Sequence, residues 1–168
     1  MPPAVLDALA AFLTRRLEQA LTDEGRPVKH IRAALGHAAR PARTDAILAQ
    51  LAALAGTPEF DRLVQTMQRV RRIVPPGTAP YYDPGVLVEP AEIRLHETLG
   101  TIRFAVEGIT DLARYTDATT ELAHAVSEFF DKVYVMDGHP QRRATRRGLL
   151  AAITEFGEQT LAWEHLHG

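Results

Sequence analysis

Four arginine side chains open the last amphipathic stretch of this 168-residue chain, at Arg142, Arg143, Arg146 and Arg147. Pro140, just before them, is typical of a first helical position, because its fixed φ is helical and its missing N–H is not needed there. The helix macrodipole makes such a start positive, so each cation there is unfavourable by about 0.3–1 kcal/mol. Guanidinium groups beside unpaired amide N–H groups bind anions, and phosphate is the anion we expect here. The alternative is a solvated basic face paired with acidic neighbours.

A second group of cations lies earlier in the chain. Polar side chains recur at helical spacing and form one strip of a predicted helix: Arg62, Gln65, Arg69 and Arg72. Arg71 adds a further guanidinium beside the strip. A solvent-facing helix side is again the alternative interpretation.

Motifs for other chemistry were not found in the sequence. The chain has no cysteine, which excludes disulfides, thiol catalysis and cysteine-ligated zinc. Its histidines form no His-Glu-x-x-His pattern, and no Gly-rich phosphate loop or nucleophile elbow occurs. Carboxylates are scattered without a pair suited to general acid–base work. We therefore expect no catalytic site and no metal site in this chain.

Composition indicates an ordinary folded protein. Hydrophobic residues make up 46% and charged residues 24%, enough to build a buried core. The net charge of −2 gives no global attraction to nucleic acid, so such binding would depend on local arginine clusters. No secretory signal and no membrane-spanning run is recognised, so we expect a cytoplasmic protein with no membrane partner.

Hydrophobic periodicity predicts an all-α fold, a bundle of about six to seven helices. The expected helices span residues 3–24, 28–35, 42–55, 58–74, 90–115, 117–136 and 140–166. Gly100 and Gly108 lie inside one of them, and we attribute both to close approach of a neighbouring helix, since glycine costs a helix about 1 kcal/mol. Tyr134-Val135-Met136 favours a strand but is too short to form one.

Prolines interrupt the helical pattern between residues 75 and 90, where Pro75, Pro76, Pro80, Pro84 and Pro90 occur. We interpret this stretch as an irregular connection between two subdomains. The expected organisation is an N-terminal helical subdomain, 1–74, a Pro-rich connection, 75–90, and a C-terminal helical subdomain, 91–168.

Two blocks of the sequence carry a family resemblance. The first is Phe129-Phe130-Asp131-Lys132-Val133-Tyr134-Val135-Met136, followed by Arg143, Arg146, Leu149 and Leu150. The second is Thr57-Pro58-Glu59-Phe60, followed by Arg69-Val70-Arg71-Arg72-Ile73. In order and spacing these blocks resemble the C-terminal, DALR-type anticodon-binding domain of the bacterial glycyl-tRNA synthetase beta subunit. The chain departs from the family at Lys132 and Arg72, where asparagine is usual, and these changes suggest fewer base contacts and more phosphate contacts.

The resemblance implies a DALR-type helical bundle that docks the anticodon arm of glycine tRNA. It also implies that the chain is a piece of a larger beta subunit, which pairs with an alpha subunit carrying the ATP, Mg and glycine site, so that no cofactor is expected in this chain. The side chains expected to hold phosphate are Lys132, Arg142, Arg143, Arg146 and Arg147, with Arg69 and Arg72 as a second patch if the two blocks share a face. Tyr134, Tyr81 and Tyr82 are candidates for base stacking. The alternative function is a helical module that mediates subunit assembly without direct tRNA contact.

Overall fold

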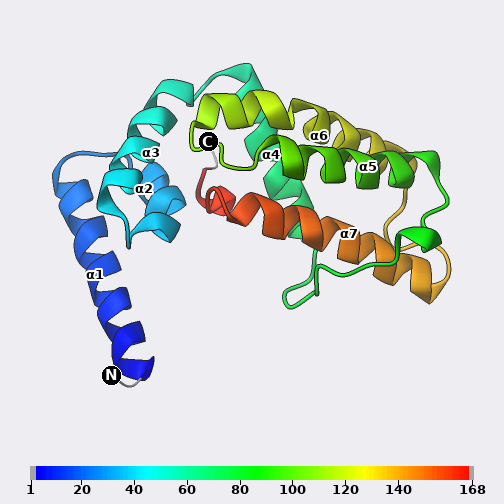
Figure 1. The fold of residues 1–168 in the computed structure, drawn as a ribbon, viewed down its shortest axis with the longest axis horizontal. Helices are drawn as coiled ribbons and strands as arrows, with labels where there is room; N and C mark the ends of the chain where they lie inside the picture. The colour runs from blue at the N-terminus through cyan, green and yellow to red at the C-terminus, as the bar shows by residue number, and fades with distance from the viewer. Residues whose placement is uncertain (1–2, 167–168) are drawn as a thin grey trace. The chain divides into compact units, whose positions relative to one another are not determined.

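A computed structural model describes residues 3–166 and confirms the all-α fold (Figure 1). Its helices are α1 (Pro3–Asp23), α2 (Val28–Ala34), α3 (Pro41–Leu54), α4 (Pro58–Ile73), α5 (Pro90–Ala105), α6 (Leu112–Lys132) and α7 (Pro140–Glu158). Short 3-10 turns occupy Leu35–His37, Pro84–Val86 and Trp163–His165. The described residues contain no β-strand.

Proline sets the start of several helices. It occupies the first turn of α3, α4, α5 and α7, as the sequence predicts. Several boundaries differ from our expectation, and α6 ends at Lys132 rather than at residue 136. The helix beginning at Pro90 ends at Ala105, because Gly108 takes a left-handed conformation (φ +75°), and α6 begins at Leu112 with the Asp111 side chain capping the N–H of Arg114.

The explanation offered for the two glycines was wrong. A Cβ at Gly100 or Gly108 would meet no atom within 4 Å, so neither position is required by a close neighbour. Gly108 is explained instead by its positive φ. The last predicted helix is also shorter than expected, since α7 ends at Glu158 and the chain then forms the turn Trp163–His165.

The described parts of the chain form two compact units, which we describe separately. Unit 1 takes in the described residues of Met1–Ala55 and Leu161–Gly168, and unit 2 is Gly56–Thr160. In unit 1, α2 packs against α1, α3 and the turn Trp163–His165. The backbone N–H of Ala162 donates to the carbonyl of Ala33 at 2.9 Å and ties the last segment to α2.

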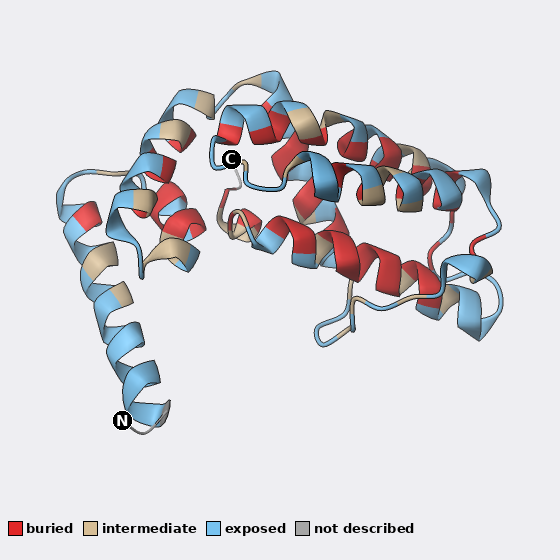
Figure 2. Cartoon of the chain, viewed as in Figure 1, coloured by how far each residue is buried: buried red, intermediate tan, exposed pale blue. Residues whose placement is uncertain are grey.

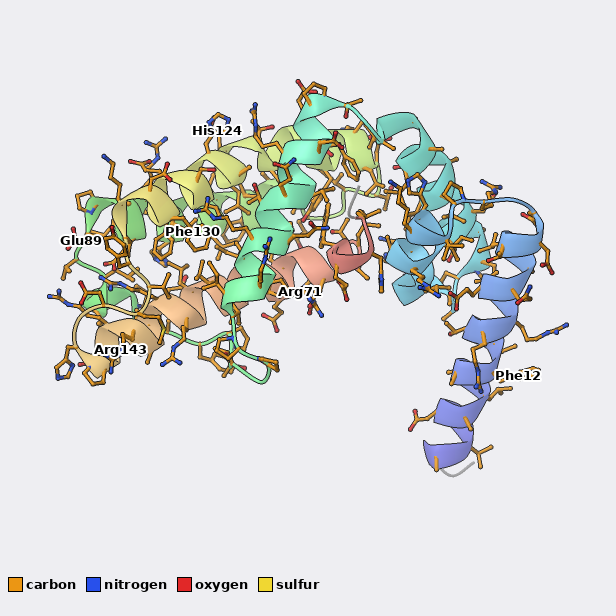
Figure 3. The ribbon with its side chains drawn as sticks, turned by 180° about the vertical axis from the view of Figure 1, so that it is seen from behind. Phe12, Arg71, Glu89, His124, Phe130 and Arg143 are labelled. Atoms are coloured by element: carbon orange, nitrogen blue, oxygen red, sulfur yellow. The ribbon has the colours of Figure 1, made fainter. Side chains whose placement is uncertain are left out.

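The first half of α1 carries its apolar stripe on the outside. Every described side chain from Ala4 to Leu13 is exposed (Figure 2). The stripe consists of Val5, Leu6, Leu9, Phe12 and Leu13, which are each about half exposed. Phe12 points away from the rest of unit 1 (Figure 3). Among residues 4–23, whose burial the structure describes, only Leu21 near the end of the helix is buried.

Unit 2 is a bundle of α4, α5, α6 and α7. Helices α5 and α6 lie side by side, and α4 packs against both α6 and α7. The fully buried apolar side chains of its core include Leu95, Leu122, Phe129, Leu149 and Ile153. The Pro-rich stretch 75–90, which we expected to separate two subdomains, lies inside unit 2. The physical reason is that α4 precedes the stretch but packs on the helices that follow it.

Candidate nucleic-acid interface

The connection between α6 and α7 presents a tyrosine to solvent. Side chains along this connection alternate between buried and exposed positions, because Val133 adopts an extended backbone (φ −123°, ψ 121°) at the end of α6. Val133 and Val135 are buried, whereas Tyr134 is 83% exposed and Met136 is 66% exposed. Two valines therefore anchor this short connection in the core and leave an aromatic and a thioether side chain accessible.

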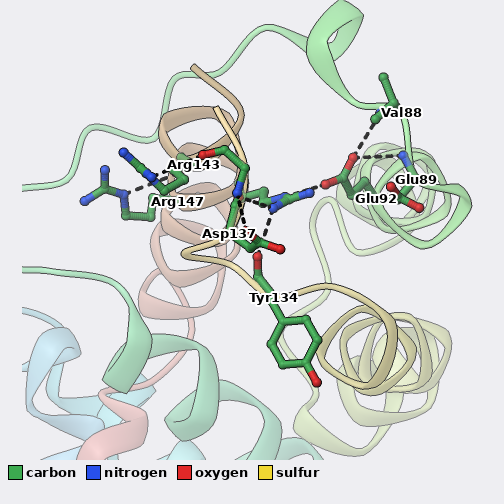
Figure 4. A network of polar contacts seen from close by, with 9 residues as sticks. Val88, Glu89, Glu92, Tyr134, Asp137, Arg143 and Arg147 are labelled. Atoms are coloured by element: carbon green, nitrogen blue, oxygen red, sulfur yellow. Dashed lines mark hydrogen bonds and ion pairs between the residues drawn. The ribbon is translucent and has the colours of Figure 1, made fainter. Parts of the chain in front are cut away.

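The buried side chain of Arg146 binds the backbone of the same connection. Its Nη1 donates to the carbonyl oxygens of Tyr134 and Asp137, each at 2.8 Å, and its Nε donates to Glu92 Oε1 at 2.5 Å (Figure 4). The Arg146 side chain is only 7% exposed and that of Glu92 only 2%. This arginine is thus an internal clamp joining α5, α7 and the α6–α7 connection.

Glu92 is also the residue that caps the start of α5. Its Oε2 accepts the backbone N–H of Val88 at 2.9 Å and of Glu89 at 3.0 Å, and Glu89 completes a capping box. Burial by itself would raise the pKa of the Glu92 carboxyl, but these N–H donors and Arg146 outweigh it and hold the pKa below its ordinary value. The carboxylate is therefore ionised, and both of its oxygens accept hydrogen bonds inside the fold.

The structure removes Arg146 from the set of side chains available to phosphate. Three of its N–H donors are taken by a carboxylate and two carbonyls, and a side chain that is only 7% exposed leaves little surface for a phosphate to reach. Sequence reasoning did not find Glu92, although Glu89 and Glu92 have the spacing of a capping box before an apolar stretch.

The remaining cations of the first block stay accessible. Lys132, the last residue of α6, and Arg142, in the first turn of α7, are exposed. Arg143 and Arg147 are half-buried, with Arg143 Nη1 donating to the carbonyl of Gly138 at 3.1 Å and Arg147 Nε to that of Arg143 at 3.4 Å. In Figure 4 both guanidinium groups lie on the opposite side of the clamp from Glu92.

The amide donors at the start of α7 are partly used. The N–H of Gln141 donates to His139 Nδ1 at 3.3 Å, and the N–H of Arg143 to the carbonyl of His139 at 3.2 Å. Charge along α7 runs against the macrodipole, with arginines in its first turns and Glu155 and Glu158 near its end. This distribution does not serve the stability of the helix, which favours a role for the arginines at the surface.

The second sequence block, which contains Arg69, contacts the first block, which contains Phe130, through a cation–π interaction. The Arg69 guanidinium lies 4.4 Å from the centroid of the Phe130 ring, a cation–π contact between α4 and α6. Phe130 lies beside α4 in Figure 3 and packs edge-to-face on Phe129. Arg69 and Arg72 line a surface hollow of about 490 Å³ together with Gln65, Gln68 and Ile73. The two blocks are therefore neighbours in space at the end of α6.

Arg71 lies away from this region, since it forms an ion pair with Glu158 near the end of α7. Tyr82 is likewise directed inward, with its hydroxyl 2.8 Å from His96 Nδ1. Within residues 3–166, no group of three or more His, Asp or Glu side chains could hold a metal ion. No helix of that range is long and apolar enough to cross a membrane.

Comparison with known proteins yields one consistent set of relatives. The chain is 32% identical over 160 residues to a glycine–tRNA ligase beta subunit of Sodalis glossinidius, and the match covers 91% of this chain and 23% of the relative. It is 36% identical over 161 residues to the protein of that name from Janthinobacterium sp., covering 90% of this chain and 23% of the relative. The chain thus spans about a quarter of the length of these relatives. No protein-family model matches it.

Proposed function

Because this chain is homologous over nine-tenths of its length to part of the glycine–tRNA ligase beta subunit, we propose that it is an RNA-binding module of such an enzyme. In this proposal it holds the anticodon arm of glycine tRNA. ATP- and Mg-dependent aminoacylation is assigned to a separate alpha subunit, and the enzyme works in the cytoplasm. The chain contributes grip on the tRNA rather than chemistry.

The observation that carries the proposal is the exposed Tyr134 flanked by cations. Anticodon loops offer unpaired bases that stack on aromatic rings and phosphates that bind Arg and Lys. Tyr134 is 83% exposed, Lys132 precedes it by two residues, and Arg143 binds the same connection at Gly138. Since Arg146 and Glu92 fix this connection from inside, the backbone that carries the aromatic ring is ordered before binding.

The accessible cations divide into two groups in this proposal. Lys132, Arg142, Arg143 and Arg147 contact the phosphates next to the base that stacks on Tyr134. Arg69 and Arg72, which share a hollow on α4, contact the backbone further along the RNA. Phe130 orients Arg69 by the contact of its ring with the guanidinium.

The salt dependence of binding tests this assignment. The RNA is the anticodon stem-loop of a glycine tRNA, and the variant is the double substitution Lys132→Ala and Arg143→Ala. Each lost phosphate contact is expected to reduce the slope of log K against log salt by about 0.7, the value for single-stranded nucleic acid. The matched control is Arg114→Ala, which removes an exposed arginine at the start of α6.

We expect the double variant to bind more weakly with a flatter slope and the control to behave as the unmodified chain. Equal slopes for all three proteins would refute the assignment of these cations. If the unmodified chain binds the stem-loop no better than an unrelated hairpin at every salt concentration, the anticodon-arm proposal itself fails.

A second candidate function is favoured by the exposed stripe of α1. A contiguous apolar face on a helix that packs only through its later turns is typical of a surface that another protein covers. In this alternative the stripe binds the alpha subunit and the chain makes no direct tRNA contact. This alternative would be favoured if the unmodified chain captured the alpha subunit, a Leu9→Asp, Phe12→Asp variant did not, and neither protein bound the stem-loop.

A further inference from the structure

Two adjacent tyrosines in the Pro-rich segment have opposite orientations. Tyr82 points inward, where its hydroxyl lies 2.8 Å from His96 Nδ1 and its ring meets the imidazole edge-on, with ring centroids 5.7 Å apart. Tyr81 is 84% exposed. Tyr82 therefore anchors the segment to α5, and Tyr81 carries an accessible ring on an anchored backbone.

The backbone of Tyr81 sits on α7 at a glycine. A Cβ at Gly148 would lie 2.3 Å from the Tyr81 carbonyl oxygen and 3.0 Å from Tyr82 Cβ, so only glycine permits this approach. Glycine in the middle of a helix costs about 1 kcal/mol relative to alanine. The helix itself gains nothing from Gly148, and the close seat of the Tyr81 backbone is what the glycine provides.

The segment follows one face of α7 towards its basic end. Arg71 pairs with Glu158 near the end of α7, and a hollow of about 430 Å³ between Pro75–Pro80 and the side of α7 includes Thr154 and Glu155. Further along α7, the backbone of Tyr81 packs against Gly148.

The residue before Gly148 is Arg147, and Arg143 is one turn earlier. Five residues of helix, from Arg143 to Gly148, span about 7.5 Å along the axis. The backbone that carries the exposed ring of Tyr81 is therefore seated on α7 within two helical turns of the arginines that we assign to phosphate.

We propose that Tyr81 is a second base-stacking residue of this site and that Gly148 and Tyr82 are the residues that position it. The site then takes two unpaired nucleotides, one on Tyr134 and one on Tyr81, with Arg143 and Arg147 on the backbone between them. Prolines on both sides of Tyr81 restrict its segment before binding, which reduces the entropy lost in the complex. This inference rests on the proposed function and extends the same site.

The test uses the anticodon stem-loop of a glycine tRNA with 2-aminopurine at one loop position at a time, since stacking on a ring quenches its fluorescence. Tyr81→Ala is expected to weaken binding about 5- to 150-fold, the range for loss of one stacked base. It should abolish quenching at one loop position, and Tyr134→Ala at a different one. Tyr81→Phe should retain binding and quenching, because the ring remains. The matched control is Phe104→Ala, which removes an 81%-exposed aromatic ring at the end of α5.

Gly148→Ala tests the positioning role. It should give the same loss of quenching as Tyr81→Ala and should shift the His96 imidazole signals in the NMR spectrum, because the added methyl displaces the backbone that carries Tyr82. Tyr81→Ala could bind the stem-loop and quench its fluorescence as Phe104→Ala does, while the Lys132→Ala, Arg143→Ala variant still shows a flatter salt slope. That result would overturn the inference and leave the proposed function standing. If the unmodified chain does not bind the stem-loop, both the inference and the proposed function are refuted.

Discussion

Arg146→Ala tests the distinction between an arginine that holds the fold and an arginine that holds RNA. The substitution deletes donors to Glu92, to the carbonyl of Tyr134 and to that of Asp137. The two carbonyls belong to exposed residues and can be hydrated after the change. Glu92 cannot, because it is 1% exposed and its other oxygen stays bound to the backbone N–H groups of Val88 and Glu89, just before α5.

The magnitude follows from that buried carboxylate. Removing one partner of a buried ion pair costs about 3–5 kcal/mol, since the remaining charge is left without compensation. We expect Arg146→Ala to lower the free energy of unfolding of unit 2 by this amount. Arg146→Lys should recover part of it, because lysine restores the charge but not the planar fork that reaches three acceptors. Arg143→Ala, which loses one bond at the surface, should cost less than about 1 kcal/mol.

The assay is urea unfolding followed by circular dichroism at several pH values. The pKa of Glu92 is lower in the folded protein than in the unfolded chain. The stability it contributes is therefore present above the unfolded pKa and is lost as pH falls through the folded pKa. The unmodified chain should lose stability on acidification below about pH 4.3, the ordinary pKa of glutamate, and Arg146→Ala should show a smaller loss there.

Two results would refute this reasoning. One is an Arg146→Ala variant as stable as Arg143→Ala, which would mean that the clamp contributes nothing to the fold. The other is an Arg146→Ala variant that keeps full stability and flattens the salt slope of RNA binding as the Lys132→Ala, Arg143→Ala variant does. That outcome would return Arg146 to the set of phosphate contacts.

Three further outcomes are expected. Phe12→Ala should change the free energy of unfolding by less than about 1 kcal/mol, whereas Phe129→Ala, fully buried, should cost about 3–5 kcal/mol, as measured by urea unfolding. Tyr82→Phe should cost about 0.5–1.5 kcal/mol for the lost bond to His96, and no loss would mean that the segment needs no such anchor. Burial raises the pKa of Tyr115 to about 12, although a hydrogen bond with Thr160 opposes the shift, so ultraviolet titration should find a tyrosine that ionises near pH 12. The stability that Tyr115 supplies while protonated should fall away as pH rises above its unfolded pKa of about 10.

Local signals were sufficient for the helical fold. The apolar stripes and the prolines at helix starts identified the main helices, and their physical basis is local geometry: proline fits a first turn, and periodic apolar residues form a face. Local signals failed where the chain merely continued an apolar pattern. The stretch from Pro90 to Tyr115 looked like one helix, but Gly108 supplies a left-handed turn that ends it.

The site was only partly predictable for a different reason. Periodicity on α1 identified Leu9 and Phe12 as members of one apolar face but could not say that nothing in the described chain covers that face. In the same way, the pair Tyr81 and Tyr82 gave no sign of which ring turns inward. That choice depends on His96 of α5 and on Gly148 of α7, which are brought to the segment only by folding.

The amino-acid sequence by itself determined that this protein is a helical bundle, that it is related to part of a glycine–tRNA ligase beta subunit, and that its last long helix begins with arginines. The tertiary structure alone decided which of those arginines can meet another molecule. Arg142, Arg143, Arg146 and Arg147 all lie within about 140° of one helix circumference, so helical spacing cannot separate them. Arg146 is the one that meets Glu92, a residue 54 positions earlier, and a contact across that separation exists only once α5 and α7 have packed together.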